Sequence, residues 1–161
     1  MIIRRTKIGT TPVTVEEAKQ HLRLAGDTFD SILTGYIEAA VDHAENVTGL
    51  VLRDGSQYEV VDEYSETVRT GILPIRSVRV EVDSTPTDEY TVEGSAVLLP
   101  ADPTARIAEV EVETGFDRFP DGIKAAILLI VGKLFANPAD GVENLPSAST
   151  NLLRNYRRWD N

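Results

Sequence analysis

The strongest pattern in the chain is an amphipathic stretch from residue 28 to residue 48. Apolar side chains recur there at intervals of three and four residues, which is the spacing of an α-helix with one buried face. The residues of this face are Ile32, Leu33, Tyr36, Ile37, Ala40, Val41, Ala44 and Val47. Asp27 or Thr28 can cap the start of this helix, and Gly49 suits its end because glycine enters the left-handed conformation without a steric penalty.

Three further helices are predicted from the same period. The first covers residues 15–24 and begins with a capping box, in which Thr14 and Glu17 satisfy each other's backbone N–H groups. The second covers residues 121–136, directly after Pro120, and has a broad apolar face. The third is short, over residues 151–159, where apolar and aromatic side chains stand at helical spacing: Leu152, Leu153, Tyr156 and Trp159.

The segment between the helices, residues 50–114, has the alternating pattern of β-strands. Valines 78, 80 and 82 alternate with charged residues, and the same alternation returns at residues 107–113. Asp54-Gly55 predicts a hairpin turn between residues 50–53 and 57–64, and Gly94-Ser95 predicts a second one between residues 90–93 and 96–99. Five or six short strands of this kind indicate a small antiparallel sheet or sandwich.

These elements predict an α+β fold in which a helical bundle core carries an inserted β region. We expect a single domain over residues 1–161, with residues 1–49 and 115–161 forming the helical part and residues 50–114 forming the β insertion. Residues 139–149 are rich in Gly, Pro, Ser, Asn and Asp, which is typical of a connection. Residues 139–161 therefore form a C-terminal arm with some reach.

Composition and charge exclude several classes of protein. The chain is 42% hydrophobic and 26% charged, as in ordinary globular domains. Its formal charge of -10 opposes any binding that depends on neutralising many DNA phosphates. The longest apolar run, residues 125–131, is far short of the roughly 20 residues that span a bilayer. No cysteine occurs, so thiolate metal sites, disulfides and a cysteine nucleophile are excluded together.

No group of residues predicts catalysis, a metal site or a cofactor. The only histidines are His21 and His43, and the residues around His43 diverge around a helix instead of converging on one ion. Gly94-Ser95 lacks the surroundings of a serine nucleophile. Glu109, Glu111 and Glu113 share one strand face, and we interpret them as a solvated surface whose mutual repulsion a basic partner would relieve. We therefore do not expect an enzyme.

The C-terminal segment has the composition of a protein interface. Large amphipathic rings and guanidinium groups dominate interface hot spots, and this segment combines both beside an apolar residue. The candidate partner-binding residues are Leu153, Arg154, Tyr156, Arg157, Arg158 and Trp159. The alternative is that the last helix folds back and buries Leu153 and Trp159 against its own domain.

The order of several motifs resembles one known family, the head-tail connector or adaptor proteins of tailed double-stranded DNA bacteriophages and prophages. The likeness covers nearly the whole chain, although the segment 134–138 departs from the commoner pattern. The motifs are the opening Pro12-Val13-Thr14-Val15-Glu16-Glu17-Ala18-Lys19, Glu45-x-x-Thr48-Gly49, Leu73-Pro74-Ile75-x-Ser77-Val78, Thr114-Gly115-Phe116 with Pro120-x-x-Ile123-Lys124, and Leu152-Leu153-x-x-Tyr156-Arg157.

The resemblance implies a structural protein of the virion. Its members form a ring of about twelve copies beneath the portal protein at the head-tail junction, although a subunit can be monomeric when isolated. Such a ring extends the DNA channel, through which double-stranded DNA passes without specific binding, and it offers a surface to a stopper or tail-completion protein. The resemblance also implies that the C-terminal arm contacts the portal, and that synthesis and assembly take place in the host bacterial cytoplasm.

A DNA-packaging component, such as a small terminase-like DNA-recognition subunit, is the competing interpretation. The first two predicted helices argue against it, because a DNA-reading helix concentrates lysine and arginine on one face. Here those helices carry mostly acidic residues: Glu16, Glu17, Asp30, Glu38, Asp42 and Glu45, against Lys19 and Arg23.

Overall fold

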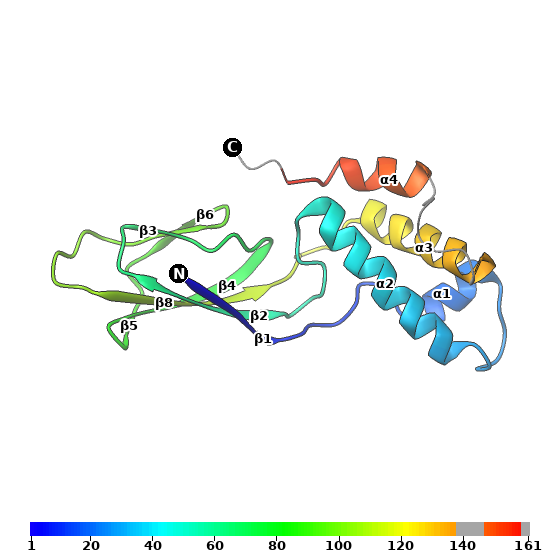
Figure 1. Ribbon diagram of the computed structural model, residues 1–161, viewed down its shortest axis with the longest axis horizontal. Coiled ribbons are helices and arrows are strands. Elements are labelled where there is room, and N and C mark those ends of the chain that lie inside the picture. Colours follow the sequence, from blue (N-terminus) through cyan, green and yellow to red (C-terminus); the bar gives the residue numbers. More distant parts are fainter. Residues whose placement is uncertain (138–146, 159–161) are drawn as a thin grey trace. The chain divides into compact units, whose positions relative to one another are not determined.

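The chain folds into two units in the computed structural model, which describes residues 1–137 and 147–158 (Figure 1). The helical unit contains Thr11–Leu52 and the described part of Arg118–Asn161. The sheet unit contains Met1–Thr10 and Arg53–Asp117. The mixed α+β class expected from the sequence is confirmed, and each unit has its own core.

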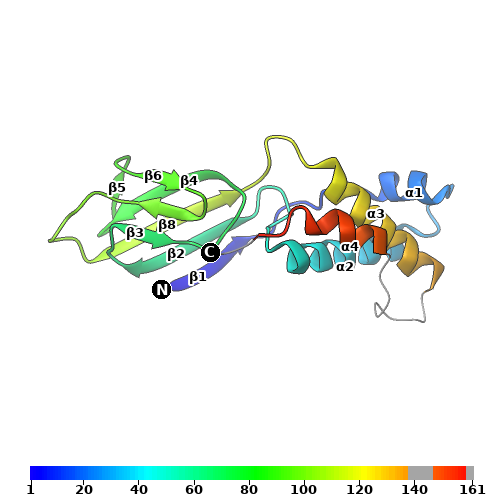
Figure 2. The same ribbon diagram turned by 90° about the horizontal axis from the view of Figure 1, so that it is seen from above.

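The helical unit holds α1 (Val15–Leu22), α2 (Asp30–Thr48), α3 (Asp121–Ala136) and α4 (Ser147–Arg154). α3 packs against all three other helices, and α2 also contacts α1 and α4 (Figures 1 and 2). The core is formed by the apolar faces that the helical period predicts, and its fully buried members include Leu33, Val41, Ile123, Ile127 and Ile130.

Two predicted helix ends are confirmed and one is wrong. The capping box of α1 is present, since the Glu17 N–H donates to Thr14 Oγ1 and the Thr14 N–H donates to Glu17 Oε2. Gly49 ends α2 in the left-handed conformation, with φ 70°. Neither Asp27 nor Thr28 caps α2, because the N-cap is Phe29, which makes no side-chain capping bond. Asp27 instead binds Lys19, with Nζ 3.1 Å from Oδ1.

The last helix begins and ends earlier than predicted. It covers Ser147–Arg154 and not residues 151–159, so residues 147–149 of the expected connection are helical. The backbone turns after Leu153, where the Tyr156 N–H donates to the Leu153 carbonyl at 3.0 Å. The Arg158 N–H then donates to the Thr48 carbonyl at 2.7 Å, which anchors the chain at the C-terminal end of α2.

An ion pair joins the start of α1 to α3. Lys124 Nζ on α3 donates to Glu17 Oε1, and both side chains are about one-third exposed. The hydrogen bond from Lys124 is the main reason why the pKa of Glu17 lies below its usual value, and the N–H of Thr14 lowers this pKa further. Glu17 thus serves the cap of its own helix and the contact with α3.

Replacing Glu17 by glutamine is expected to reduce stability in a pH-dependent way. Glutamine preserves the capping box but loses the charge on which the Lys124 contact depends. A carboxyl whose folded pKa is lowered stabilises the fold above its unfolded pKa and loses that contribution as the pH falls through the folded pKa. Urea unfolding at neutral pH should show a loss of about 0.5–1 kcal/mol, small because the pair is partly solvated.

The difference between Glu17→Gln and the unchanged chain should disappear in strongly acidic buffer. Glu16→Gln is the matched control, because Glu16 makes only an exposed contact of 3.7 Å to Lys19. An equal loss in both variants at neutral pH would show that the Lys124 contact contributes nothing.

The sheet unit consists of two antiparallel sheets (Figures 1 and 2). The larger sheet has the order β1-β2-β8-β4-β5, and the smaller one has the order β3-β7-β6 and lies over one face of the larger. The strands are β1 (Ile2–Lys7), β2 (Gln57–Glu63), β3 (Thr67–Arg69), β4 (Ile75–Val82), β5 (Thr85–Thr87), β6 (Thr91–Glu93), β7 (Ala96–Leu98) and β8 (Ile107–Thr114).

The alternation predicted for the sheet is confirmed. Ala108, Val110 and Val112 of β8 are buried, while the intervening glutamates face outward. Val60 of β2 and Val80 of β4 lie directly opposite Val110 in the register and are buried as well. The hairpin around Gly94 is also confirmed, with β6 and β7 antiparallel and Gly94 at φ 59°.

Two expectations about the start of the sheet are wrong. Residues 50–53 form no strand, because Asp54 pairs instead with Thr10 through two backbone hydrogen bonds of 2.9 Å. The strand beside β2 on this side is β1, so the first residues, which were expected in the helical part, belong to the sheet. β1 is exposed along its whole length and has no buried face, so the alternation that marks the other strands is absent.

Candidate interaction surfaces

The outer face of the larger sheet carries rows of charged side chains. In one row Arg4 lies opposite Glu59, Glu59 opposite Glu111, and Glu111 opposite Arg79. Arg79 Nη1 is 3.7 Å from Glu111 Oε2, and Arg4 Nη1 is 3.5 Å from Glu59 Oε2. The two arginines therefore balance two glutamates that would otherwise repel each other across neighbouring strands.

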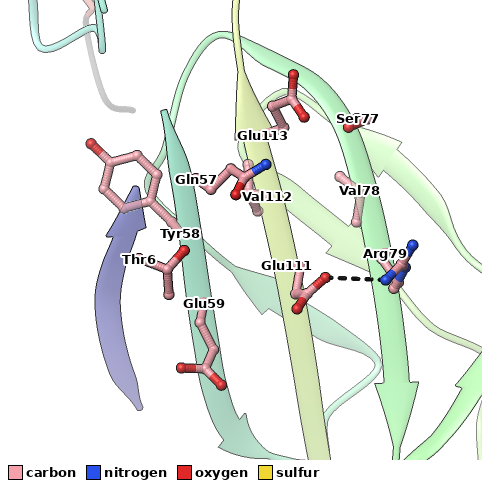
Figure 3. Close-up of a pocket in the computed structure, with 10 residues that line it drawn as sticks. All are labelled: Thr6, Gln57, Tyr58, Glu59, Ser77, Val78, Arg79, Glu111, Val112 and Glu113. Atoms are coloured by element: carbon pink, nitrogen blue, oxygen red, sulfur yellow. Dashed lines mark ion pairs between the residues drawn. The ribbon is translucent and has the colours of Figure 1, made fainter. Parts of the chain in front are cut away.

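A hollow of about 610 Å³ lies over this face (Figure 3). Its lining side chains come from β1, β2, β4 and β8, and most of them are polar. They are Thr6, Gln57, Tyr58, Glu59, Ser77, Val78, Arg79, Glu111, Val112 and Glu113. The lining side chains offer hydrogen bonds and charges of both signs to a polar surface.

The glutamates predicted as a solvated strand face are placed as expected. Glu111 is exposed, and Glu109 and Glu113 are half-buried among neighbouring strands. Glu109 faces another carboxylate, since Glu81 lies directly opposite it on β4. Glu113 has a cation within reach, with Arg76 Nη1 at 3.8 Å from Oε1. The face is therefore acidic but partly balanced by arginines of the same unit.

Arg76 ties together three segments of the sheet unit. Its guanidinium donates to both carboxylate oxygens of Asp54, at 2.6 and 3.3 Å, and to the Phe116 carbonyl at 3.1 Å. The hydrogen bond to Asp54 is also the main reason why the pKa of Arg76 is raised. A Cβ at Gly115 would lie 2.3 Å from Arg76 Cζ, so glycine is needed for this close approach. These contacts fix the fold locally and leave no free charge for a ligand.

A second charged cluster links α1 to the start of α2. The Lys19 side chain is only 10% exposed, and its Nζ lies 3.1 Å from both Asp27 Oδ1 and Asp30 Oδ1. Hydrogen bonds to Asp27 and then Asp30 raise the pKa of Lys19. The lysine is thus held as a cation between two carboxylates. This cluster connects α1 to the start of α2.

The structure separates the candidate residues of the C-terminal arm into buried and exposed ones. Leu153 is fully buried in the helical unit. This agrees with the alternative interpretation, in which the last helix packs Leu153 against its own domain. Tyr156 and Arg158 are half-buried, while Arg154 and Arg157 are exposed. The ring of Tyr156 lies against α3, because a Cβ at Gly122 would come within 2.8 Å of its hydroxyl. Trp159 lies outside the described residues.

The described residues contain no group of three or more metal-ligating side chains that could hold an ion. His21 is exposed, as the sequence suggests. His43 is partly buried, and burial lowers its pKa, which favours the neutral ring. None of the described helices is both long enough and apolar enough to cross a bilayer.

A large exposed apolar surface lies at strand β1 and was not expected from the sequence. Ile2, Ile3 and the following Ile8 are 61%, 48% and 63% exposed, and Arg4, Arg5 and Lys7 stand between them. The only signal in the sequence was the β-branched character of the first residues. The mixture of charges with isoleucines hid it, because it matches neither the helical nor the strand period.

Residues 12–77 match the family of phage gp6-like head-tail connector proteins. The resemblance read from the sequence is confirmed. The matched segment contains the Pro12-Val13-Thr14 opening, the Glu45-x-x-Thr48-Gly49 end of α2 and the Leu73-Pro74-Ile75 motif. The match therefore includes parts of both units. No curated protein matches the sequence.

Solved structures show the same fold over almost the whole length of the chain. A chain in the neck of an empty gene transfer agent particle, computed with C6 symmetry, is 19% identical with a TM-score of 0.75. A chain in the neck of the native particle, computed with C12 symmetry, is 18% identical with a TM-score of 0.73. A chain of the virion of the native particle is 19% identical with a TM-score of 0.73. Each alignment covers 99% of this chain and 97% of the other.

Proposed function

We propose that this protein is a structural head-tail connector subunit that forms a ring on the portal of a phage or prophage particle. The ring extends the DNA channel and offers the attachment surface for a stopper or tail-completion protein. It acts at the head-tail junction of the virion, after synthesis and assembly in the host bacterial cytoplasm. The observation that carries the proposal is the match of residues 12–77 to the gp6-like connector family.

The structural neighbours support a ring. The similar chain of the native gene transfer agent particle belongs to a neck computed with C12 symmetry, and its fold matches this chain almost from end to end. A fold shared along the whole length keeps the same faces available for contacts with neighbouring copies. Cyclic symmetry of about twelve copies is therefore the arrangement that we propose for this chain.

The charge of the chain suits a channel through which DNA must slide. Each subunit carries a formal charge of -10, so a ring of such subunits repels the DNA backbone. Tight DNA binding depends on cations that displace condensed counterions, and the outer sheet face instead carries Glu59, Glu109, Glu111 and Glu113. This supports passage of DNA without retention and disfavours a DNA-recognition role.

Mixing the purified protein with the portal of the same particle tests the proposal. Light scattering should show a small species for the chain alone and a large complex with the portal, and electron microscopy of that complex should show a ring of connector density beneath the portal. A chain that never binds its portal, under conditions in which the portal itself is assembled, would refute the proposed function.

Reversing the charge of Arg154 is expected to weaken portal binding by about tenfold or more, as for a hot-spot arginine. Arg154 is exposed at the end of α4, so Arg154→Glu should leave the helical core intact. Binding of the portal to immobilised chain measures the effect. Arg118→Glu is the control, because Arg118 is an exposed arginine of the same unit but lies outside the arm. Equal binding by both variants would remove Arg154 from the portal contact.

A further inference from the structure

Strand β1 is an open edge of the larger sheet. It hydrogen-bonds β2 on one side only, and in the described part of the chain no strand lies on its other side. All six residues of β1 are exposed, which is unusual for a strand with two isoleucines. A long unpaired edge can accept another strand, provided that the charges of the two strands are compatible.

The charges of β1 limit what can pair with it. Arg4, Arg5 and Lys7 make the strand basic, and within the described residues only Arg4 has an ion pair, to Glu59. Two copies of β1 side by side would bring these cations together, which costs energy across neighbouring strands. The strand that suits this edge must therefore be acidic and must itself be an edge.

Strand β6 meets both requirements. It is the last strand of the smaller sheet, and its three residues are exposed, with Val92 41% exposed. The exposed residues Asp88 and Glu89 precede the strand, and Glu93 ends it. The Tyr90 hydroxyl donates to the Val78 carbonyl at 2.8 Å, which holds the start of β6 against β4. The edge is thus acidic, partly apolar and fixed in position.

The other two edges of the sheet unit are less suited. β5 carries Pro86 in the middle of its three residues, and proline cannot donate a hydrogen bond to an added strand. β3 ends with the exposed cation Arg69, which would repel a basic strand. β1 and β6 lie at opposite sides of the sheet unit in Figure 2, so a contact between them must come from two different copies oriented head to tail.

We propose that β1 of one copy pairs with the β6 edge of the next, and that this contact joins neighbouring subunits around the ring. The contact places the cations of β1 near Asp88, Glu89 and Glu93, and it covers Ile3 and Val92. A head-to-tail contact of this kind uses two different surfaces and closes into a ring when the rotation between copies divides the circle evenly. The inference rests on the proposed function, from which it takes the ring.

Cysteine cross-linking tests the contact, because the natural chain has no cysteine that could react in the background. Thr6→Cys places a thiol on β1 and Thr91→Cys places one on β6, and both threonines are exposed. One variant carries a tag that changes its mass, so heterodimers and homodimers separate on a denaturing gel. After the two variants are mixed, assembled on the portal and treated with a short bismaleimide, the heterodimer should be the main product.

The matched control replaces Thr91→Cys by Thr85→Cys, an exposed threonine on the edge strand β5. The yield with Thr91→Cys should exceed the yield with Thr85→Cys by about tenfold or more, as a specific contact requires. Equal yields, or a product dominated by Thr6→Cys homodimers, would overturn the proposal. The double variant, with both cysteines in one chain, should give a ladder of covalent oligomers.

A charge exchange separates a direct contact from a change in folding. Arg5→Glu, added to the Thr6→Cys chain, should reduce the heterodimer yield, and Glu93→Arg, added to the Thr91→Cys chain, should restore it. Failure of the second change to restore the yield would count against direct pairing. If rings form on the portal but the threonine pair does not cross-link, the edge assignment is wrong and the proposed function stands. If the pair cross-links but no ring forms, the proposed function is wrong and the contact remains.

Discussion

Replacing Leu153 by alanine is expected to lower the free energy of unfolding by about 4 kcal/mol. The side chain is fully buried, and α4 packs against α3 and α2, so the substitution leaves a cavity in the helical unit. Removing large aliphatic side chains from a core costs both their transfer from water and the cavity that remains. Urea unfolding followed by the helical circular dichroism signal measures the loss.

Leu152→Ala is the matched control for Leu153→Ala. Leu152 is the preceding residue of the same helix and is only half-buried, so its removal should cost less than half as much. Equal and small losses in both variants would show that α4 is not part of the helical core in solution. The arm would then be free to move as a whole, and Leu153 would return to the set of residues that can contact a portal.

Replacing Gly9 by alanine is expected to lower the stability of the sheet unit by about 3 kcal/mol. A Cβ at this position would lie 2.2 Å from the Asp54 carbonyl oxygen and 2.6 Å from the Ser56 nitrogen. Both are backbone atoms, so no side chain can rotate away, and the hydrogen bond from Gly9 N–H to Ser56 Oγ at 2.9 Å would be displaced as well. The substitution should therefore separate β1 from β2.

Hydrogen exchange of the β1 and β2 amides is the most direct measurement for Gly9→Ala, since it reports on this strand pair separately. Gly35→Ala is the control, because a Cβ at Gly35 meets no atom within 4 Å and the residue lies inside α2. Alanine favours the helix, so that variant should gain about 0.5–1 kcal/mol. Unchanged protection of β1 in Gly9→Ala would show that the backbone accommodates the methyl group without separating β1 from β2.

The parts of the fold that the sequence predicted are those in which one face of an element is buried. α2 and β8 are the best examples. Val41 and Val110 lie on faces that are buried away from water, while the opposite faces carry charged residues. Where no face is buried, the pattern carries no information. β1 shows this, since its position depends on hydrogen bonds to β2, more than fifty residues later in the chain.

The sequence indicated which residue types belong to the candidate surfaces, but it did not indicate which of those residues are exposed. Arg154 and Leu153 are adjacent, and the sequence assigned both to the same interface, yet one is exposed and the other lies in the core. Helical spacing could not decide between them, because the last helix ends several residues before the predicted end. The sequence could not predict that β1 and β6 are edge strands. Which strands lie at an edge depends on the order of strands in the folded sheet.

The path of the chain between its units has a consequence for synthesis on the ribosome. The chain leaves the helical unit after Leu52 and returns to it at Arg118, so α1 and α2 emerge before the helix that completes their core. At ordinary translation speeds this interval is on the order of 10 s. The sheet unit has all its strands by Asp117 and can fold first, while the apolar sides of the two early helices remain accessible to chaperones.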